Sequence, residues 1–522
     1  MSPGDSPGAP KSRPQWPWVL LLIVLGCFRV FLMSAAFPFF GNVDEMAHLD
    51  TIYGHAQGME SAHIRRYTPE SARLLAVYYS PEFLNPPAAN GAPYPRPGWE
   101  SAGDSQSPDT LNALQVMGDM PNHDSTSPPL YYELEAGWRS VGLDNGLAGL
   151  PLLYWLRFLN VPLYAAGMLF GWLFCRDFLP ETPVWRWGVL VMLAAWPQDV
   201  FYSLNNDVLS FPLGGAVLFF LGAGLWVRAS AKKRLPGIPE SLGAGLALAL
   251  GILTKLSNLP LFLPGLLAQC VSTKKSEEEK SGAPWLRRAV FALAALVPPG
   301  IWAAYDYLNS GDLTGSAGKV QMLGWTIKPF REMFHNPVFT VSGAWSFWSG
   351  LMQTWWRGEL YWHGSRLASP VADDFFIVSS TLFLGLTAAE LGIFWWKHER
   401  KWDDFRRVQA FCLLFFFSFV AYLLALGLPY DFHNCVFPSR AYPYFTTGRL
   451  MTAAMVPFAV VYLRGFTLLC GRCSQKVQLA IFCLLMLWVA GGDLAISGSV
   501  FTSEYNWFHL QKPVDPVIAQ LR

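Results

Sequence analysis

Two adjacent carboxylates, Asp44 and Glu45, stand just after the first long apolar stretch of the chain, residues 17–40. Ionised groups at a membrane boundary lose hydration, and neighbouring carboxylates repel each other. Both effects raise the pKa of a carboxyl group, which suits a general base that removes a proton from an attacking hydroxyl. We therefore predict a catalytic role for Asp44. The alternative is that Asp44 is an ordinary N-cap of the helix that follows it.

Histidines follow these acids in a pattern that predicts a helix over residues 43–57. His48 and His55 share one face of that helix with Asp44. Either histidine could orient Asp44 or contact a substrate phosphate. Asp44 and His48 are four residues apart and could reach the same metal ion. Because the local sequence offers no third ligand, we predict no metal cofactor, with a divalent cation as the alternative.

A second group of candidates consists of basic residues near the ends of apolar stretches. Arg449 follows Gly448 where the apolar stretch 449–469 begins. Free N–H groups at a helix start, together with a guanidinium group, form an anion site. Gly448 would let a phosphate approach the backbone closely. The alternative for Arg449 is a side chain that extends to the membrane surface without binding a ligand.

Two further cations could contact a lipid phosphate. Lys255 lies between two short apolar stretches, 241–254 and 257–272, and Arg440 lies in the loop 429–448. If the two short stretches form a re-entrant pair, Lys255 lies deeper in the membrane and its functional case is stronger.

Aromatic residues crowd the predicted loop 309–374. Tryptophan and tyrosine are typical of membrane interfaces, and their rings can also stack on sugars. Within this loop, the segment 355–359 combines aromatic and charged side chains. We therefore expect Trp356, Arg357 and Glu359 to contact substrate.

Two other polar features have mainly structural explanations. Turn chemistry accounts for Asn205, Asn206 and Asp207, which separate two apolar stretches. Arg29 lies midway along the first apolar stretch and needs a buried partner, and Asp493 is the candidate for that ion pair.

The elements that must position these residues are apolar helices. The chain has 522 residues, of which 52% are hydrophobic and 14% charged, and its mean hydropathy is +0.27. This composition predicts an all-α polytopic membrane protein. The net charge of +1 gives no reason to expect nucleic-acid binding. We predict about eleven transmembrane helices at 17–40, 150–175, 187–204, 207–227, 241–254, 257–272, 288–308, 375–396, 409–428, 449–469 and 477–497.

Lysine and arginine determine the predicted orientation. They gather in the short segments 176–186, 228–234, 274–288, 397–407 and 464–476, which we therefore place in the cytoplasm with the N-terminus. Loops 41–149 and 309–374 then form a mixed extracytoplasmic cap on the membrane domain, which spans residues 17–497. Residues 1–16 are expected to be a disordered cytoplasmic segment, and 498–522 a short extracytoplasmic tail. The sequence has no Asn-x-Ser/Thr site, which favours a bacterial inner membrane.

Several short segments together resemble the GT-C class of integral-membrane glycosyltransferases. The likeness is strongest to bacterial relatives of the protein O-mannosyltransferases and the lipid A aminoarabinose transferases. The resembling segments are Val43–His48, Ser127–Tyr132, Asn205–Leu209, Gly251–Ser257 and Gly448–Leu450. They occur in the order, and on the predicted membrane side, that this class shows. Met46 and Leu450 depart from its usual pattern, which has proline after Asp-Glu and an aromatic residue after Gly-Arg.

The resemblance implies a GT-C-like fold and a sugar donor carried on a polyprenyl phosphate. It implies that the sugar is transferred, with inversion, to an extracytoplasmic glycan, lipid or protein acceptor. Asp44 would be the catalytic base, with Glu45 beside it in the acceptor or donor site, and Arg449 would neutralise the leaving phosphate. Tyr131 would belong to the substrate site. Such a donor contains no nucleotide diphosphate that demands a metal.

Two other functions remain as alternatives. An envelope-polymer ligase or polymerase would move a whole glycan from a lipid diphosphate, which requires more cationic residues than loop 309–374 offers. A lipid or solute transporter would require paired charges deep in several spans, and only Arg29 and Asp493 meet that requirement.

Overall fold

The computed structural model describes most of the chain. Three parts of the chain lie outside the described residues. They are residues 1–14 of the expected disordered segment, residues 511–522 of the expected tail, and much of the predicted cytoplasmic loops. The described residues are 15–41, 43–59, 61–89, 94–100, 108–225, 238–270, 284–397 and 402–510.

Helices make up nearly all of the regular structure in these ranges, so the expected all-α class is confirmed. Seven helical stretches are long and apolar enough to cross a membrane. They are α1 (Trp16–Ala36), α6 with α7 (Gly149–Phe158 and Asn160–Phe178), α12 (Pro284–Ser310), α16 (Pro370–Lys397), α17 (Asp404–Leu426), η7 with α18 (Gly448–Ala454 and Met455–Leu469) and α19 (Gln475–Ile496).

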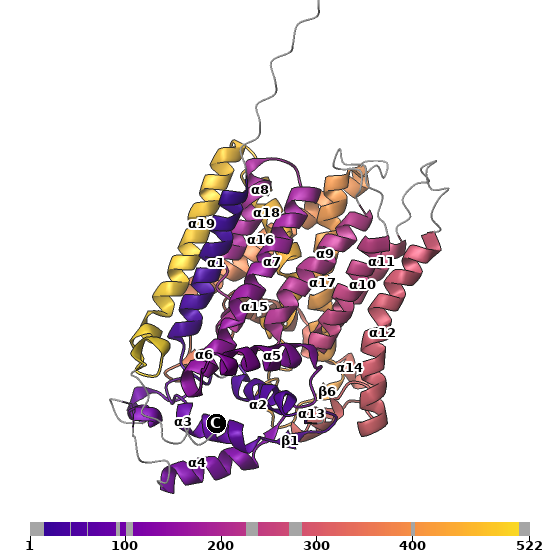
Figure 1. Ribbon diagram of the computed structural model, residues 1–522. Helices are drawn as coiled ribbons and strands as arrows, with labels where there is room; N and C mark the ends of the chain where they lie inside the picture. Colours follow the sequence, from indigo (N-terminus) through magenta and orange to yellow (C-terminus); the bar gives the residue numbers. More distant parts are fainter. Residues whose placement is uncertain are drawn as a thin grey trace, which may run out of the picture.

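Four shorter apolar helices complete the bundle in Figure 1. They are α8 (Pro183–Ala195), α9 (Asp207–Leu225), α10 (Ile238–Thr254) and η4 with α11 (Leu256–Leu261 and Phe262–Cys270). The structure thus supports a multi-pass membrane protein, whereas eleven crossings and a GT-C-like arrangement remain predictions.

Burial distinguishes the central helices from the outer ones. Helix α18 is buried on nearly all sides, while α19 exposes large apolar side chains such as Leu484 and Leu487. An apolar helix that is buried all round belongs in a core, and one with an apolar exposed face suits contact with lipid. The predicted partners Arg29 and Asp493 do form an ion pair, at 3.6 Å, where α1 lies beside α19.

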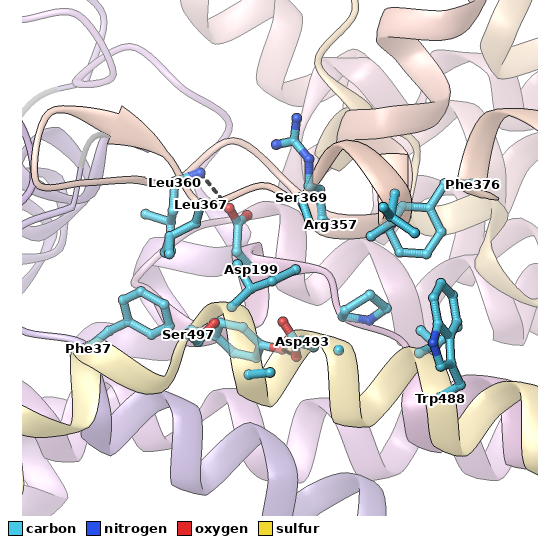
Figure 2. A pocket seen from close by; sticks show the side chains of 18 residues that line it. Phe37, Asp199, Arg357, Leu360, Leu367, Ser369, Phe376, Trp488, Asp493 and Ser497 are labelled. Carbon is cyan, nitrogen blue, oxygen red and sulfur yellow. Dashed lines mark hydrogen bonds between the residues drawn. The ribbon is translucent and has the colours of Figure 1, made fainter. Parts of the chain in front are cut away.

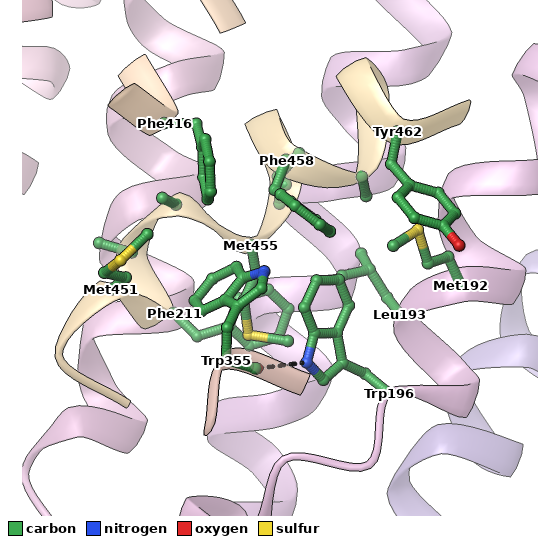
Figure 3. Close-up of a cluster of buried hydrophobic side chains, with 14 of the residues drawn as sticks. Met192, Leu193, Trp196, Phe211, Trp355, Phe416, Met451, Met455, Phe458 and Tyr462 are labelled. Carbon is green, nitrogen blue, oxygen red and sulfur yellow. Dashed lines mark hydrogen bonds between the residues drawn. The ribbon is translucent and has the colours of Figure 1, made fainter. Parts of the chain in front are cut away.

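The centre of the bundle contains tryptophans from the segment 355–359, for which the sequence suggested membrane-interface or sugar-stacking roles. Trp355 and Trp356 are completely buried. Figure 3 shows Trp355 and Trp196 among methionine and phenylalanine side chains from several helices, with the indole of Trp196 donating to the Trp355 carbonyl at 3.3 Å. The predicted substrate contact of Trp356 is wrong, because helix α15 (Val341–Arg357) packs into the bundle and buries this side chain.

The two long loops fold together at one end of the bundle (Figure 1). Loop 41–149 contributes α2 (Glu45–Ala56), β1 (Arg65–Arg66), α3 (Pro69–Tyr78), η1 (Pro87–Ala89), η2 (Gly98–Glu100), α4 (Pro108–Asp119), β2 (Pro121–Asn122) and α5 (Leu130–Asp144). Loop 309–374 contributes α13 (Ala317–Met322), β3 (Thr326–Ile327), α14 (Phe330–Met333), η6 (Pro337–Phe339), α15, β4 (Tyr361–Trp362) and β5 (Ser365–Arg366). The helix predicted over 43–57 is confirmed as α2.

Short antiparallel pairs and the end of the chain tie this cap together. β1 pairs with β2, β4 with β5, and β3 with β6 (Tyr430–Asp431), which comes from a third loop. After α19, η8 (Gly498–Thr502) and η9 (Trp507–His509) also contact the cap, since the Tyr505 hydroxyl donates to the Pro95 carbonyl at 2.7 Å. The cap is therefore held to the bundle from several points along the chain.

Candidate functional site

Asp44 is positioned by the junction between α1 and α2. Its backbone is left-handed (φ 64°, ψ 14°), a conformation that aspartate tolerates better than most residues. It occupies the N-cap position of α2, but its side chain makes no capping hydrogen bond. The side chain is one-third exposed and pairs with Arg449. Helix capping therefore does not explain this residue.

Arg449 meets Asp44 although 405 residues separate them in the chain. One guanidinium nitrogen lies 2.6 Å from Asp44 Oδ2, and the others lie 3.2 Å from Glu359 Oε2 and 3.4 Å from Asp207 Oδ2. Lys255 Nζ binds the same Asp207 oxygen at 2.7 Å. The structure thus joins four predicted or noted residues, from the start of α2, from α9, from the end of α10 and from the loop after α15, around one arginine.

Histidines and a second lysine extend this group toward the cap. His123 Nε2 lies 3.5 Å from Asp44 Oδ1 and 3.4 Å from Asp124 Oδ2. Lys319, from α13, binds the other oxygen of Asp124 at 3.1 Å, and His48 Nε2 lies 3.8 Å from Asp124 Oδ2. We call the whole set the charged cluster: Asp44, His48, His123, Asp124, Asp207, Lys255, Lys319, Glu359 and Arg449.

Electrostatics in the charged cluster differ from the sequence prediction. Burial raises the pKa of Asp44, but Arg449, His123 and Lys319 outweigh that effect and hold it well below its ordinary value. The predicted raised pKa is wrong because Glu45 turns away and cations surround Asp44 instead. The pKa of Asp124 is also lowered. Burial raises it, but the nearby cations, Lys319 foremost, lower it by more. Burial raises the pKa of Glu359 in spite of its contact with Arg449.

His48 is a neutral imidazole with one ring nitrogen uncommitted to any hydrogen bond. Its Nδ1 lies 2.9 Å from the hydroxyl of Tyr132, while its buried Nε2 has no hydrogen-bond partner. Burial lowers the pKa of His48 to about 3. The ring is therefore uncharged near neutral pH, and its orientation is fixed by Tyr132.

Glu45 does not join the charged cluster. Its fully buried carboxylate receives two guanidinium nitrogens of Arg157 at 2.7–3.0 Å and the backbone N–H groups of Leu204 at 2.9 Å and Gly41 at 3.0 Å. These contacts satisfy both carboxylate oxygens. The expectation that Glu45 lies in a substrate site is corrected: it anchors the end of α1 to α6 and to the loop before α9.

Gly448 also has a different role from the predicted one. Its N–H donates to Thr354 Oγ1 at 3.0 Å, and a Cβ at this position would lie 2.3 Å from the backbone nitrogen of Trp355. The residue lets η7 pack directly against α15, so no phosphate can approach there. Asp207 differs as well, because it binds Lys255 and Arg449 in addition to shaping a turn.

The other predicted substrate residues lie outside the charged cluster. Trp356 is buried, with its ring centre 5.0 Å from Phe376, and its indole donates to Ser380 at 2.9 Å. Arg357 forms a two-pronged pair with Asp373 at 2.7 and 3.0 Å. Core packing rules out the expected substrate contact for Trp356, whereas Arg357 also lines a pocket, so its expected contact stays a prediction.

Three more predicted residues lie apart from the charged cluster, and their roles stay predictions. Tyr131 is buried and its hydroxyl binds Glu135 at 3.1 Å, and His55 binds Glu133 at 2.8 Å. Arg440 is exposed and pairs with Asp431 at 2.8 and 2.9 Å. All three have partners outside the charged cluster.

A largely apolar pocket lies on the other side of the segment that carries Glu359. Figure 2 shows it between α19 and the loop after α15, with Phe37, Phe376 and Trp488 on its walls. Asp199 lines this pocket and accepts the backbone N–H groups of Glu359 and Leu360, each at 2.6 Å. Asp199 thus connects the lining of the pocket to the backbone of Glu359, a member of the charged cluster.

Sequence reasoning missed His123, Asp124, Lys319 and Tyr132 as members or supports of the site. His123 and Asp124 are adjacent polar residues shortly before the Ser127–Tyr132 segment, which was a usable signal. Nothing in the pattern around Lys319 could have identified it, because only the packing of α13 brings it to Asp124.

Comparison with known proteins adds no family to this geometry. No family model, no curated protein and no solved structure matches the chain.

Proposed function

We propose that this protein is a membrane glycosyltransferase that moves a sugar from a polyprenyl-phosphate-linked donor to an extracytoplasmic acceptor. The observation that carries the proposal is the 2.6 Å contact between Asp44 and Arg449. It puts a carboxylate that can accept a proton beside a cation that can accept a phosphate. The acceptor and the sugar are left open, and the resemblance to the GT-C class supplies the reaction type.

In the proposed reaction, an acceptor hydroxyl oxygen attacks the anomeric carbon of the donor. The hydroxyl proton passes to Asp44, and the bond between the anomeric carbon and the phosphate oxygen breaks. The polyprenyl phosphate leaves with the electron pair of that bond, and Arg449 and Lys255 stabilise its charge. Attack opposite the leaving group inverts the anomeric centre.

The resting ion pairs agree with such a cycle. Arg449 is held by three carboxylates, so an incoming phosphate would have to take over part of its hydrogen bonding. Asp44 would then lose its nearest counter-charge and become a stronger base. The Asp44 side chain is 33% exposed, which supports access to a hydroxyl.

The test is turnover of polyprenyl-phosphate sugars by the purified protein in lipid vesicles. Released polyprenyl phosphate is measured by mass spectrometry across donors with different sugars. Asp44→Asn should reduce release by at least about 100-fold, the usual size of a general-base contribution. Asp119→Asn is the matched control, because Asp119 forms an exposed ion pair with Arg66 and is not a member of the charged cluster. Full activity of a folded Asp44→Asn variant would refute the proposal.

One observation favours the diphosphate alternative over the transporter. Lys319 adds a third cation, beside Arg449 and Lys255, that loop 309–374 was not expected to supply. A lipid diphosphate carries more charge than a monophosphate and could use it. Release of polyprenyl diphosphate instead of monophosphate in the same assay would identify a ligase or polymerase.

A further inference from the structure

The acids of the charged cluster share an arrangement that their lysine and arginine partners do not explain. Asp44 gives Oδ2 to Arg449, and Asp124 gives Oδ1 to Lys319. Their other oxygens, Asp44 Oδ1 and Asp124 Oδ2, both turn toward His123 Nε2, at 3.5 and 3.4 Å. Two carboxylate oxygens from different elements therefore point into one small space.

His48 points into the same space with its uncommitted nitrogen. One ligand atom each from Asp44, His48 and Asp124 lies within 4.8 Å of the others. His48 is only 1% exposed, and its Nε2 has no hydrogen-bond partner. A buried polar atom without a partner is uncommon and calls for an explanation. An ion between these groups supplies one.

The other ring nitrogen of His48 has a hydrogen-bond partner, as is usual for histidines that bind metals. The Tyr132 hydroxyl lies 2.9 Å from His48 Nδ1 and fixes the ring, leaving Nε2 directed at the acids. Among the described residues, no other three His, Cys, Asp or Glu side chains bring their ligand atoms this close together.

We propose that Asp44, His48 and Asp124 bind a divalent first-row metal ion, with His123 as a candidate fourth ligand. Carboxylate and imidazole donors together suit Mn²⁺, Fe²⁺ or Zn²⁺. Donors on one such ion lie about 3–3.5 Å apart, so binding would draw these side chains inward by small rotations. Asp44 and Asp124 keep their second oxygens for Arg449 and Lys319.

Charge balance gives the ion a role in recognising an anionic ligand. In the charged cluster, the carboxylates of Asp44, Asp124, Asp207 and Glu359 face the cations of Lys255, Lys319 and Arg449. With all acids ionised and the histidines neutral, the acids exceed the cations by one charge. A divalent ion reverses that sign and favours a phosphate. This role rests on the proposed function, whereas the ion site itself does not.

The experiment is Mn²⁺ titration of the full-length protein, purified in detergent with a tag that contains no histidine and stripped with chelator. Electron paramagnetic resonance of free Mn²⁺ reports the bound fraction. Wild type should bind one ion per chain, and Asp124→Asn and His48→Gln should each bind at least tenfold more weakly. His55→Gln is the matched control, because His55 lies on the same helix but binds Glu133. Equal binding by wild type and both site variants would overturn the proposal.

The variants could lose Mn²⁺ binding because they misfold, so a second measurement uses the wild-type protein alone. Bound Mn²⁺ should show nitrogen hyperfine coupling from a histidine ring in pulsed resonance spectra. Binding without nitrogen coupling would mean an adventitious surface ion and would also overturn the proposal. The two proposals fail separately: Mn²⁺ binding needs no donor lipid, and turnover of a sugar donor by the metal-stripped protein would remove the catalytic role of the ion without touching the glycosyltransferase assignment.

Discussion

Adjacent acids with opposite roles provide the sharpest test of the structure. Glu45→Gln should lower stability strongly and leave the chemistry of the folded fraction intact, whereas Asp44→Asn should do the reverse. Glu45 and Arg157 are both at most 1% exposed, and the pair includes three guanidinium contacts. Losing one partner leaves the other charge buried, which typically costs about 3–5 kcal/mol.

A double-mutant cycle separates the energy of the Glu45–Arg157 interaction from the other effects of each substitution. Glu45→Ala and Arg157→Ala should each cost about 3–5 kcal/mol, and the double variant should cost much less than the sum of the two. Arg157 also donates to the carbonyls of Ser34 at 2.9 Å and Pro38 at 3.0 Å. These contacts remain in the Glu45 variants, so part of the α1–α6 junction survives.

The assay is unfolding in mixed detergent micelles, followed by tryptophan fluorescence, together with sugar-donor turnover per folded molecule. A Glu45→Gln protein as stable as wild type but inactive would refute the structural assignment. It would restore the role that the sequence suggested, with Glu45 facing a substrate. Additive effects in the double-mutant cycle would show that the pair is not the source of the loss.

Three further outcomes are expected. Gly448→Ala should destabilise by about 1–3 kcal/mol, because its Cβ would meet the Trp355 backbone, whereas Gly385→Ala meets no atom within 4 Å and should not; melting temperatures check this. Burial raises the pKa of Glu82, so the folded protein favours the protonated carboxyl group. The free energy of unfolding therefore falls as the pH rises and Glu82 ionises. Glu82→Gln should therefore melt above wild type at pH 7, with the gap closing toward pH 4. Arg440→Ala should keep donor turnover within about twofold, since Arg440 pairs only with the exposed Asp431 and its neighbour His433.

Much of the architecture follows from the sequence because apolar length and helical periodicity are local properties. The α2 helix, the candidate spans and the Arg29–Asp493 pair could all be predicted, since burying Arg29 in an apolar bundle requires an acid nearby. Asp44, Lys255 and Arg449 were also identified, because each is a charged residue beside an apolar stretch.

The direction of each side chain could not be predicted in the same way. Glu45 follows Asp44 in sequence, but one step along the start of a helix rotates the side chain by roughly 100°, which sends Glu45 to Arg157 and leaves Asp44 with Arg449. Trp356 was predicted to contact substrate because a tryptophan ring can stack on a sugar, but the same ring also packs well in a core. Only the packing of α15 against α16 and α18 decides between them.

The pattern of satisfied and unsatisfied atoms separates structure from function within this end of the bundle. Buried ion pairs rarely add net stability, so their presence alone identifies no site. Around Glu45 every carboxylate oxygen has donors, as expected of a network that serves only to hold the fold. In the charged cluster, His48 Nε2 and Asp207 Oδ1 are buried without hydrogen-bond partners. A ligand would satisfy these two atoms, so the contrast with Glu45 supports the proposal that the chemistry lies in the charged cluster.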